Sequence, residues 1–219
     1  MRTSRALAVP AARKLRKGGR HPLTRQAVAE SQRSRMLEAV AQAVADKGYA
    51  ATTVADVIAL GGVSRRTFYE QFTGIETCFL AAYEAGRERL LRRIRDSVTK
   101  LPRADWRQRA RGSLAAYLEG LAAEPAASWA YSIEVFAAGR KALAERSAIL
   151  QHWVEQWREL LRIARREGAA VGNVSDARLL ALVGGIEELV RECLRTRGAS
   201  HLPELLDVTT RLAIAVAEG

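Results

Sequence analysis

Two adjacent arginines, Arg65 and Arg66, are the residues of this chain whose type and position best suit a defined chemistry. They follow a glycine pair in the run Ser64-Arg65-Arg66-Thr67-Phe68-Tyr69. The planar fork of an arginine side chain matches the O6 and N7 acceptors of guanine, so both residues are candidates for reading DNA bases. The net charge of +11 and the pI near 10.4 favour the same kind of polyanionic partner.

Catalytic and metal chemistry are not indicated by the sequence. It contains no H-E-x-x-H, P-loop, G-x-S-x-G or G-x-G-x-x-G motif, and its three histidines and two cysteines form no recognisable pair of nucleophile and base. Cys78 and Cys193 lie far apart and outside any C-x-x-C or Cys/His cluster, which argues against a disulfide framework or a zinc site. We therefore expect a protein of the reducing cytoplasm that is not an enzyme and holds no cofactor or metal.

The elements that must position these side chains are expected to be helices. The chain has 219 residues, of which 48% are apolar, and this is enough for a sizeable core. Only 5 residues are Pro, whereas Leu, Glu, Arg and Gln recur at helical spacing and alternating β-branched runs are missing. No stretch approaches the roughly 18 to 20 consecutive apolar residues of a membrane span, and no signal-peptide run follows the basic N-terminus. The sequence thus predicts an all-α protein without a membrane partner.

The stretch over residues 31–75 predicts three short helices. An apolar stripe marks the first, and a capping box of Thr53 with Asp56 opens the second. The glycine pair that follows forces a turn, after which Ser64 is a good N-cap for a third helix over residues 65–71. Three helices joined in this way form a helix-turn-helix, whose last helix lies in the major groove of DNA.

The run EAVAQAVADKGYAATTVADVIALGGVSRRTFYEQF, followed by GIETCFLAAYE, resembles the N-terminal domain of the TetR family of bacterial transcriptional repressors. The segments KGY, TTV, GVS and TFY and the closing Phe fall at the spacing of that family, over about fifty contiguous residues. The resemblance implies a basic N-terminal arm over residues 1–30, a helix-turn-helix domain over 31–76, and a ligand-binding and dimerisation domain over 77–219.

The function implied by the resemblance is transcriptional regulation in the bacterial cytoplasm, at the nucleoid. A homodimer would repress transcription from a palindromic DNA operator and would be released by a small apolar or aromatic ligand. The alternative is a ligand-independent architectural or nucleoid-associated DNA-binding protein, driven by the basic arm. Binding without a preferred DNA site, with a salt dependence that is independent of sequence, would favour that alternative.

The resemblance also assigns DNA contacts to particular residues. Arg65 and Arg66 would read bases, Tyr69 would contact a phosphate, and Thr52 or Thr53 would do the same from the start of the second helix. Glu70 would either accept a hydrogen bond from a cytosine amino group or pair with a neighbouring arginine. The full set consists of Arg65, Arg66, Thr67, Tyr69 and Gln71 on the third helix, Thr52 and Thr53, and Arg13, Lys14, Arg16, Lys17 and Arg20 in the arm.

The arm is expected to compensate for a weakly charged helix-turn-helix. Residues 1–30 carry eight basic residues and one acid, whereas residues 31–75 carry five basic residues and four acids. Many family members grip the DNA backbone with a Lys at the start of the fourth helix, where this chain has Ile75. We therefore expect the arm to bind phosphates or to enter the minor groove, the alternative being a solvated tail without a specific role.

The rest of the chain is expected to complete about nine helices, the number of the family. A capping box of Thr73 with Glu76 would open the fourth helix, and this helix would be the only element that touches both the helix-turn-helix and the middle helices. The remaining helices are expected over 106–121, 125–136, 150–168, from Asn173 or Ser175 to about 197, and from Pro203 in the first turn to about 217.

Aromatic residues concentrate in the middle helices, where the family keeps its ligand cavity. Any one of them could be plain core, but as a set they favour an apolar or aromatic ligand. The candidate pocket residues are Trp106, Tyr117, Trp129, Phe136, Trp153 and Trp157, with Glu134, Arg140 and His152 as polar groups that could orient a ligand.

The last two helices are implied by the resemblance to pack against their copies in a second subunit as a four-helix bundle. Gly184 and Gly185 interrupt an otherwise strong helix, which suits a close approach of two helices, although close packing within one chain would explain the pair equally well. The candidate interface residues are Leu182, Gly185, Ile186 and Leu189.

Overall fold

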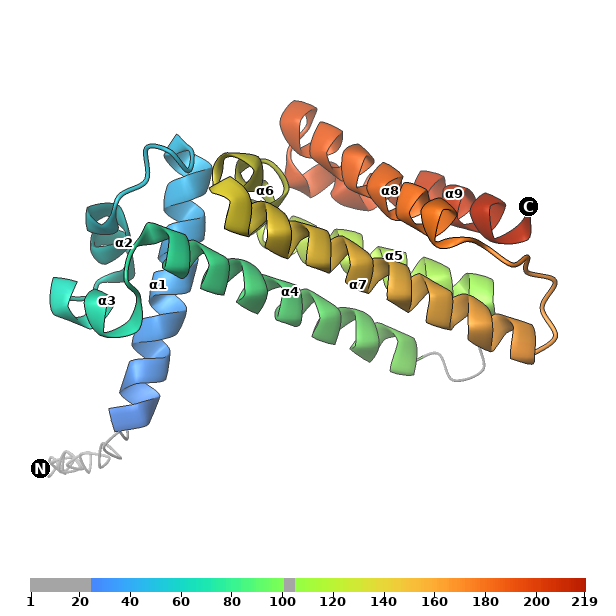
Figure 1. Ribbon diagram of the computed structural model, residues 1–219, viewed down its shortest axis with the longest axis horizontal. Coiled ribbons are helices and arrows are strands. Elements are labelled where there is room, and N and C mark those ends of the chain that lie inside the picture. The colour runs from blue at the N-terminus through green and yellow to red at the C-terminus, as the bar shows by residue number, and fades with distance from the viewer. Residues whose placement is uncertain (1–24, 101–104) are drawn as a thin grey trace, which may run out of the picture.

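The computed structural model describes residues 25–100 and 105–219. Within these ranges the protein is entirely helical, with nine α-helices, two short 3-10 helices and no strand, as Figure 1 shows. The all-α class and the number of helices predicted from the sequence are therefore confirmed for the described part of the chain.

Three helices form a small lobe at one end of the molecule: α1 (Arg25–Lys47), α2 (Val54–Gly61) and α3 (Arg65–Gln71). Helix α1 begins six residues earlier than expected, so Arg25 and the residues up to 30 belong to a helix rather than to the arm. The capping box that opens α2 is confirmed, because the Thr53 hydroxyl accepts from the Asp56 amide while the Asp56 carboxylate accepts from the Thr53 amide.

The turn between α2 and α3 is fixed from two sides. Gly62 adopts φ +57°, a left-handed conformation that disfavours residues with a Cβ, and it ends α2. The Arg35 guanidinium of α1 donates to the carbonyl oxygens of Gly61 at 2.9 Å and of Gly62 at 3.1 Å. Ser64 then caps α3 as expected, since its hydroxyl accepts from the Thr67 amide. With the turn fixed in this way, one face of α3 points outward from the lobe.

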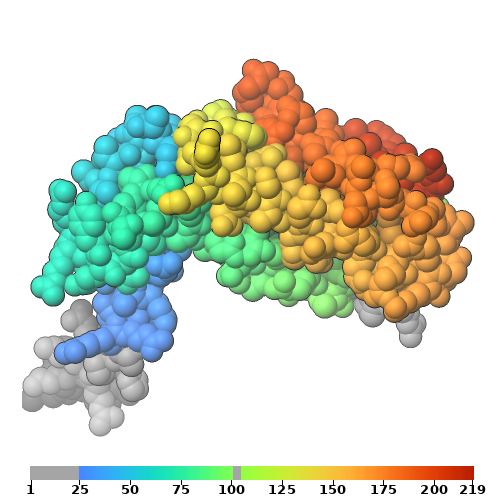
Figure 2. Space-filling view, in the orientation of Figure 1, coloured from blue at the N-terminus to red at the C-terminus, as the bar shows by residue number. Residues whose placement is uncertain are grey.

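The remaining elements form an elongated body, which Figure 2 shows beside the lobe. Three long helices run along it, and the last two helices lie together on one side (Figure 1). The elements are α4 (Ile75–Thr99), α5 (Trp106–Ala123), α6 (Pro125–Ser132), the 3-10 helix η1 (Glu134–Ala137), α7 (Gly139–Arg166), α8 (Asp176–Thr196), the 3-10 helix η2 (Ala199–Leu205) and α9 (Leu206–Glu218).

Several expected helix ends were wrong. Gly74, not Thr73, is the N-cap of α4; the Thr77 hydroxyl accepts from the amides of both residues, and Glu76 instead pairs with Lys141 of α7. Helix α6 ends at Ser132 and α7 begins at Gly139, so the segment expected as one helix over 125–136 ends in η1. Pro203 lies inside η2, because the helix that it was expected to open starts three residues later.

The lobe and the body share one hydrophobic core. Met36 of α1, Phe68 of α3 and Phe79 of α4 are fully buried in it, together with Ala130 of α6 and Val135 of η1. The expectation that α4 alone connects the two parts is therefore wrong, since α6 also packs on α1. Burial of apolar surface from both parts in one core joins them firmly.

Candidate functional site

The outward face of α3 presents the residues that the sequence assigned to DNA. Phe68 is fully buried and fixes the rotation of the helix, which leaves Arg65 and Arg66 exposed and Tyr69 49% exposed. Thr67 and Gln71 are half-buried at the edges of this face. The helix thus carries two guanidinium groups and a phenol toward solvent, a donor set that suits base edges and phosphates.

These side chains already have neighbours on the lobe. The Arg66 Nε donates to Glu70 at 2.8 Å, so of the two roles expected for Glu70 the structure supports pairing with an arginine. The Arg65 guanidinium lies 5.7 Å from the centre of the Tyr69 ring, one turn further along. Both pairs are exposed, and such contacts contribute little to stability, so DNA can replace them at small cost.

Two threonines expected to contact DNA make hydrogen bonds within the protein. Thr52 is buried, and its hydroxyl donates to the Gly48 carbonyl at 2.8 Å, so of the two threonines it is the one not presented to solvent. Thr53 is exposed, but its hydroxyl is engaged in the capping box with Asp56. The Asp56 pKa is lowered to about 2, chiefly by hydrogen bonding from Lys47 and then from Thr53, so an anionic group occupies the start of α2.

The arm residues Arg13, Lys14, Arg16, Lys17 and Arg20 lie outside the described residues. Ile75, which replaces the lysine of many family members, is half-buried against the shared core. Its position at the first turn of α4 therefore serves packing.

A cavity of about 600 Å³, here called the apolar cavity, lies between the later turns of α4 and helices α5, α7 and α8. Aliphatic and indole side chains form most of its wall, and His152 and Gln156 of α7 add polar groups, while Arg95, Arg109, Glu159 and Glu187 add charged ones. The wall includes Leu91, Ile94, Val98, Leu114, Trp153, Trp157, Leu160, Ile163, Val183 and Ile186.

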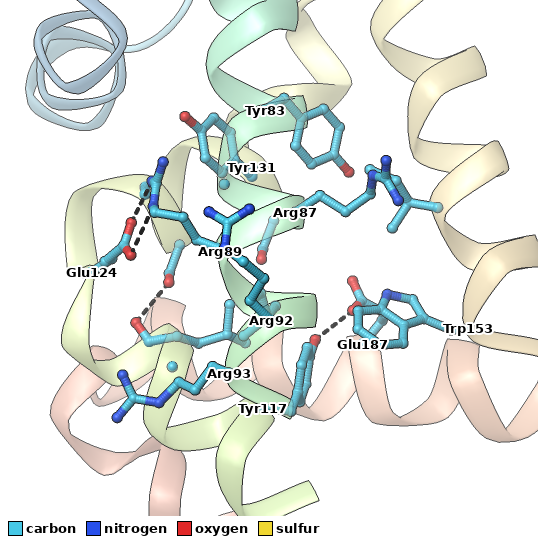
Figure 3. Close-up of a pocket in the computed structure, with 18 of the residues that line it drawn as sticks. Tyr83, Arg87, Arg89, Arg92, Arg93, Tyr117, Glu124, Tyr131, Trp153 and Glu187 are labelled. Atoms are coloured by element: carbon cyan, nitrogen blue, oxygen red, sulfur yellow. Dashed lines mark hydrogen bonds and ion pairs between the residues drawn. The ribbon is translucent and has the colours of Figure 1, made fainter. Parts of the chain in front are cut away.

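A second cavity of about 380 Å³, here called the arginine cavity, lies nearer the lobe between α4, α5, α6 and α7 (Figure 3). Three tyrosines, Tyr83, Tyr117 and Tyr131, contribute to its wall. Its charged groups are five guanidinium groups and three carboxylates, from Arg87, Arg89, Arg92, Arg93, Arg146, Asp96, Glu124 and Glu187.

Three residues line both cavities and form the boundary between them: Tyr117, Trp153 and Glu187. The Tyr117 hydroxyl donates to the Glu187 carboxylate at 2.6 Å, and the Trp153 ring lies edge-on to the Tyr117 ring at 5.8 Å. Burial raises the pKa of Tyr117 well above its ordinary value, so the hydroxyl keeps its proton. One hydrogen bond and one aromatic contact thus separate the two cavities (Figure 3).

The structure brings only half of the expected aromatic pocket residues together. Tyr117, Trp153 and Trp157 line the cavities, as does His152. Trp106 is buried in the core between α5, α7, α8 and α9, Trp129 packs against the core around Leu118, and Phe136 is 49% exposed beneath two arginines. These three line neither cavity, so their assignment to the pocket was wrong.

The arginines of the second cavity were missed by the sequence analysis, which searched for aromatic residues. A signal was available in the sequence: Arg89 and Arg93 follow Tyr83 and Gly86 at spacings that place these four residues on one side of a helix. Glu134 and Arg140, the other two polar candidates, line neither cavity.

A chain of aromatic contacts leads from the arginine cavity into the lobe. Tyr83 and Tyr131 stack with ring centres 5.0 Å apart, and Tyr131 meets Phe79 at 5.7 Å. Phe79 in turn meets Tyr49, which precedes α2, at 5.1 Å. The wall of the arginine cavity is therefore in direct packing contact with the helix-turn-helix, and a movement of the wall can be transmitted to it.

The expected dimer residues mostly face inward. Leu182 and Ile186 are 2% and 5% exposed and pack in a core with α5 and α9, so assigning them to a subunit interface was wrong. Gly185 approaches Leu212 of α9 within the same chain, and Leu189 is half-buried. The outward faces of the last two helices are formed instead by Leu180, Ala181, Gly184 and Glu188 of α8 and by Val208, Arg211 and Ala215 of α9.

The described residues have neither a candidate metal site nor a candidate membrane span. They contain no group of three or more His, Cys, Asp or Glu side chains placed to hold a metal ion. None of the described helices has the length and hydropathy of a membrane span. Both cysteines are buried, and burial raises the pKa of Cys78 to about 12, so this thiol is unreactive.

The lobe and the first turns of α4 are similar to a known protein family, and the whole fold is similar to solved structures. Residues 36–82 match the profile of a family described as bacterial regulatory proteins, tetR family. No curated protein matches the chain. The fatty acid degradation regulator FadR from Bacillus halodurans is 17% identical, with a TM-score of 0.75 over 84% of this chain and 94% of that chain.

Two further structures have the same fold. FadR from Bacillus subtilis, solved in complex with stearoyl-CoA, is 14% identical with a TM-score of 0.72 and covers 85% of this chain and 98% of that one. The tetR regulator TylP from Streptomyces fradiae is 24% identical with a TM-score of 0.61 and covers 86% and 88% of the two chains. At these identities the likeness establishes the fold.

Proposed function

We propose, from the premise that this chain is a DNA-binding regulator of the tetR family, that it represses transcription from a palindromic operator and is released by a small ligand. The observation that carries this proposal is the course of α4. Its first turns are buried in the shared core through Cys78 and Phe79, and its later turns line both cavities. A ligand that displaces α4 therefore moves the lobe that holds α3.

Arg65 and Arg66 are proposed to read bases, because both are exposed on the outward face of α3 and carry the fork that guanine accepts. Tyr69 is proposed to donate its hydroxyl to a phosphate, with Thr67 and Gln71 at the edges of the contact. Arg16, Lys17 and Arg20 of the arm are proposed to add phosphate contacts, since the lobe alone carries little net charge.

A palindromic site requires two copies of α3 related by a twofold axis. We assign the subunit interface to the outward faces of α8 and α9, where Leu180 and Val208 are exposed and Gly184 has open space beside it. These helices lie on the opposite side of the body from α4 (Figure 1), so a dimer built on them leaves α4 free to move. The domain division is then a DNA-binding lobe followed by a ligand-binding and dimerisation body.

The ligand is proposed to have a substantial apolar or aromatic part, because the larger cavity is walled by aliphatic side chains and indole rings. Ligand and operator then bind with negative coupling, typically about 1–3 kcal/mol and equal in both directions. A rotation of the lobes changes the separation of the two α3 helices from the roughly 34–36 Å between successive major grooves, and one half of the DNA contacts is lost.

Selection of bound duplexes from a random DNA pool tests this function. The expected result is a palindrome whose half-sites are centred about one helical turn apart, roughly 10 base pairs, or a multiple of it. The matched control is Arg65→Ala combined with Arg66→Ala, which should abolish enrichment while leaving the helical content unchanged. Recovery of unrelated sequences by both proteins would support the ligand-independent architectural alternative.

A further inference from the structure

We propose that the arginine cavity binds the anionic group of an amphiphilic ligand, and that the apolar part of the same ligand occupies the apolar cavity. This inference rests on the proposed function, because it names the chemical class of the regulatory ligand. One molecule would span both cavities, with its charged group at the end of the body nearer the DNA-binding lobe.

The charge of the cavity wall is the first support. Three of the five guanidinium groups already have a carboxylate partner: Arg87 pairs with Glu84, Arg89 with Glu124 and Arg92 with Glu88. Arg93 and Arg146 make no ion pair with any described residue, although the Arg146 guanidinium lies 4.9 Å from the centre of the exposed Phe136 ring. The wall carries five guanidinium groups against three carboxylates, so two cations without an ion pair can turn to a ligand, Arg146 by giving up its contact with Phe136.

The position of these two cations favours a bound anion. Arg93 extends along α5, where its Cδ would lie 3.3 Å from a Cβ at Gly120, so the glycine leaves room for the side chain. Arg146 reaches the cavity from α7, and its charge acts on the Tyr83 hydroxyl. Two helices thus supply one unpaired guanidinium each to the same cavity.

Tyrosine hydroxyls provide the second support. Tyr83 is only 8% exposed and lines the cavity, yet its hydroxyl has no hydrogen-bond partner among the described residues. Burial raises the pKa of Tyr83 and of Tyr131, so both hydroxyls remain protonated and can donate. The Tyr83 hydroxyl oxygen is not among the fully buried polar atoms without a partner, so it is open to the cavity, and an anionic ligand there would supply an acceptor for it.

The boundary between the cavities provides the third support. Tyr117, Trp153 and Glu187 are the residues that both cavities share, and a single hydrogen bond joins Tyr117 to Glu187. Rotation of the Tyr117 side chain would open a path from one cavity to the other. Figure 3 shows Arg89 and Arg93 on the side of Glu124, with Glu187 and Trp153 on the opposite side. An anion between Arg89 and Arg93 is therefore set apart from the Glu187 carboxylate, whereas the Tyr83 hydroxyl, on which Arg146 acts, is also within the influence of Glu187.

The lining becomes more apolar along this path. On the far side of the boundary the wall becomes aliphatic, through Ile94, Val98, Leu160 and Ile163. A wholly apolar ligand would leave the guanidinium groups without an acceptor, and a small free anion would leave the larger cavity empty. One amphiphile matches both walls.

The test uses the full chain and a set of probes with a twelve-carbon tail. Dodecyl phosphate, dodecanoate and dodecan-1-ol are titrated below their micellar concentrations, by calorimetry and by tryptophan fluorescence, with inorganic phosphate as the head group alone. The two anionic amphiphiles should bind at least about tenfold more tightly than the alcohol, which corresponds to one charge-assisted contact. Inorganic phosphate should bind far more weakly than dodecyl phosphate.

Variants separate the two ends of the ligand. Arg93→Gln combined with Arg146→Gln should weaken the anionic amphiphiles about tenfold and leave dodecan-1-ol unchanged. Leu160→Trp should weaken all three amphiphiles, because it fills the apolar cavity. Arg140→Gln is the matched control: it removes one charge from an exposed position of α7 that lines neither cavity, and it should change nothing.

Equal affinities for charged and neutral probes would overturn the anion subsite, as would a similar loss in Arg140→Gln and in the double variant. Phosphate binding as tightly as dodecyl phosphate would overturn the spanning ligand, and so would the absence of binding by every amphiphile. None of these results depends on DNA. If the proposed regulatory function is wrong, the selection from random DNA would instead yield no palindrome.

Discussion

The Glu134 carboxylate accepts a hydrogen bond of 2.9 Å from the backbone amide of Tyr49, a residue 85 positions earlier in the chain. Tyr49 immediately precedes the turn into α2, and Glu134 opens η1, which follows the cavity helix α6. The Tyr49 ring is also the last member of the aromatic chain that begins at Tyr83. The lobe is thus held to the body by a polar contact beside an apolar one.

Replacing Glu134 with Ala should lower the free energy of unfolding by about 1–3 kcal/mol, because the half-buried Tyr49 amide loses a charged acceptor. Chemical denaturation followed by circular dichroism measures the change. Glu134→Gln keeps an acceptor oxygen and should lose less than half as much. Equal losses in the two variants would show that the charge, and not the hydrogen bond, stabilises this junction.

On a selected DNA site, Arg65→Ala and Arg66→Ala should each weaken binding by about 1–3 kcal/mol while barely changing the affinity for random DNA. Fluorescence anisotropy with matched specific and random duplexes separates the two affinities. Arg140→Ala, which removes an exposed arginine of α7, serves as the control. A uniform loss on both duplexes would reassign the arginine concerned to a phosphate contact.

Removal of residues 1–24 should reduce affinity for every DNA sequence and flatten the dependence of log K on log salt concentration. The reason is that arm cations displace counterions whatever the base sequence, at a slope of about 0.9 per phosphate neutralised. Binding measured at several salt concentrations gives the slope, and the melting temperature should stay the same. An unchanged slope would mean that the arm contributes no phosphate contacts.

Asp56 should stabilise the fold in a pH-dependent way. Its pKa is lowered to about 2 by Lys47 and Thr53, so the charged form is favoured in the native state. The contribution is therefore complete above the ordinary value of 3.8 and is lost as the pH falls through about 2. Wild type should melt above Asp56→Asn at pH 7, and the difference should shrink between pH 4 and pH 2.

Asp46→Asn is the control for that series, since Asp46 lies on the exposed surface of α1, where it accepts from Gln42. A melting difference for Asp56→Asn that stays constant down to pH 2 would contradict the role assigned to the ionised carboxylate.

The interface assigned to α8 and α9 predicts that Gly184→Trp weakens dimerisation. No atom lies within 4 Å of a Cβ built at Gly184, so the substitution fits the monomer, whereas a second subunit covering this face would meet the indole. Sedimentation velocity over a concentration series should show more monomer with an unchanged circular dichroism spectrum. Ala144→Trp, on the exposed side of α7, should leave the distribution unchanged. An unaltered dimer in Gly184→Trp would place the interface elsewhere.

The sequence alone determined the helix-turn-helix, because its signals are local. The capping residues Thr53 and Ser64 act on amides three residues away, and Gly62 fixes its own backbone conformation. Such interactions span a single turn of helix, so residue type and spacing contain them fully.

Only the tertiary structure decided which residues share a cavity and which face inward. Arg93 and Arg146 lie about fifty positions apart in the sequence, on α4 and α7, and nothing in their local spacing shows that both reach one space. Leu182 and Ile186 satisfied the pattern of an interface and of a core equally well until α5 and α9 covered them. The spacing of apolar residues shows that one face of a helix is apolar. Which element covers that face is decided by the packing of the whole chain.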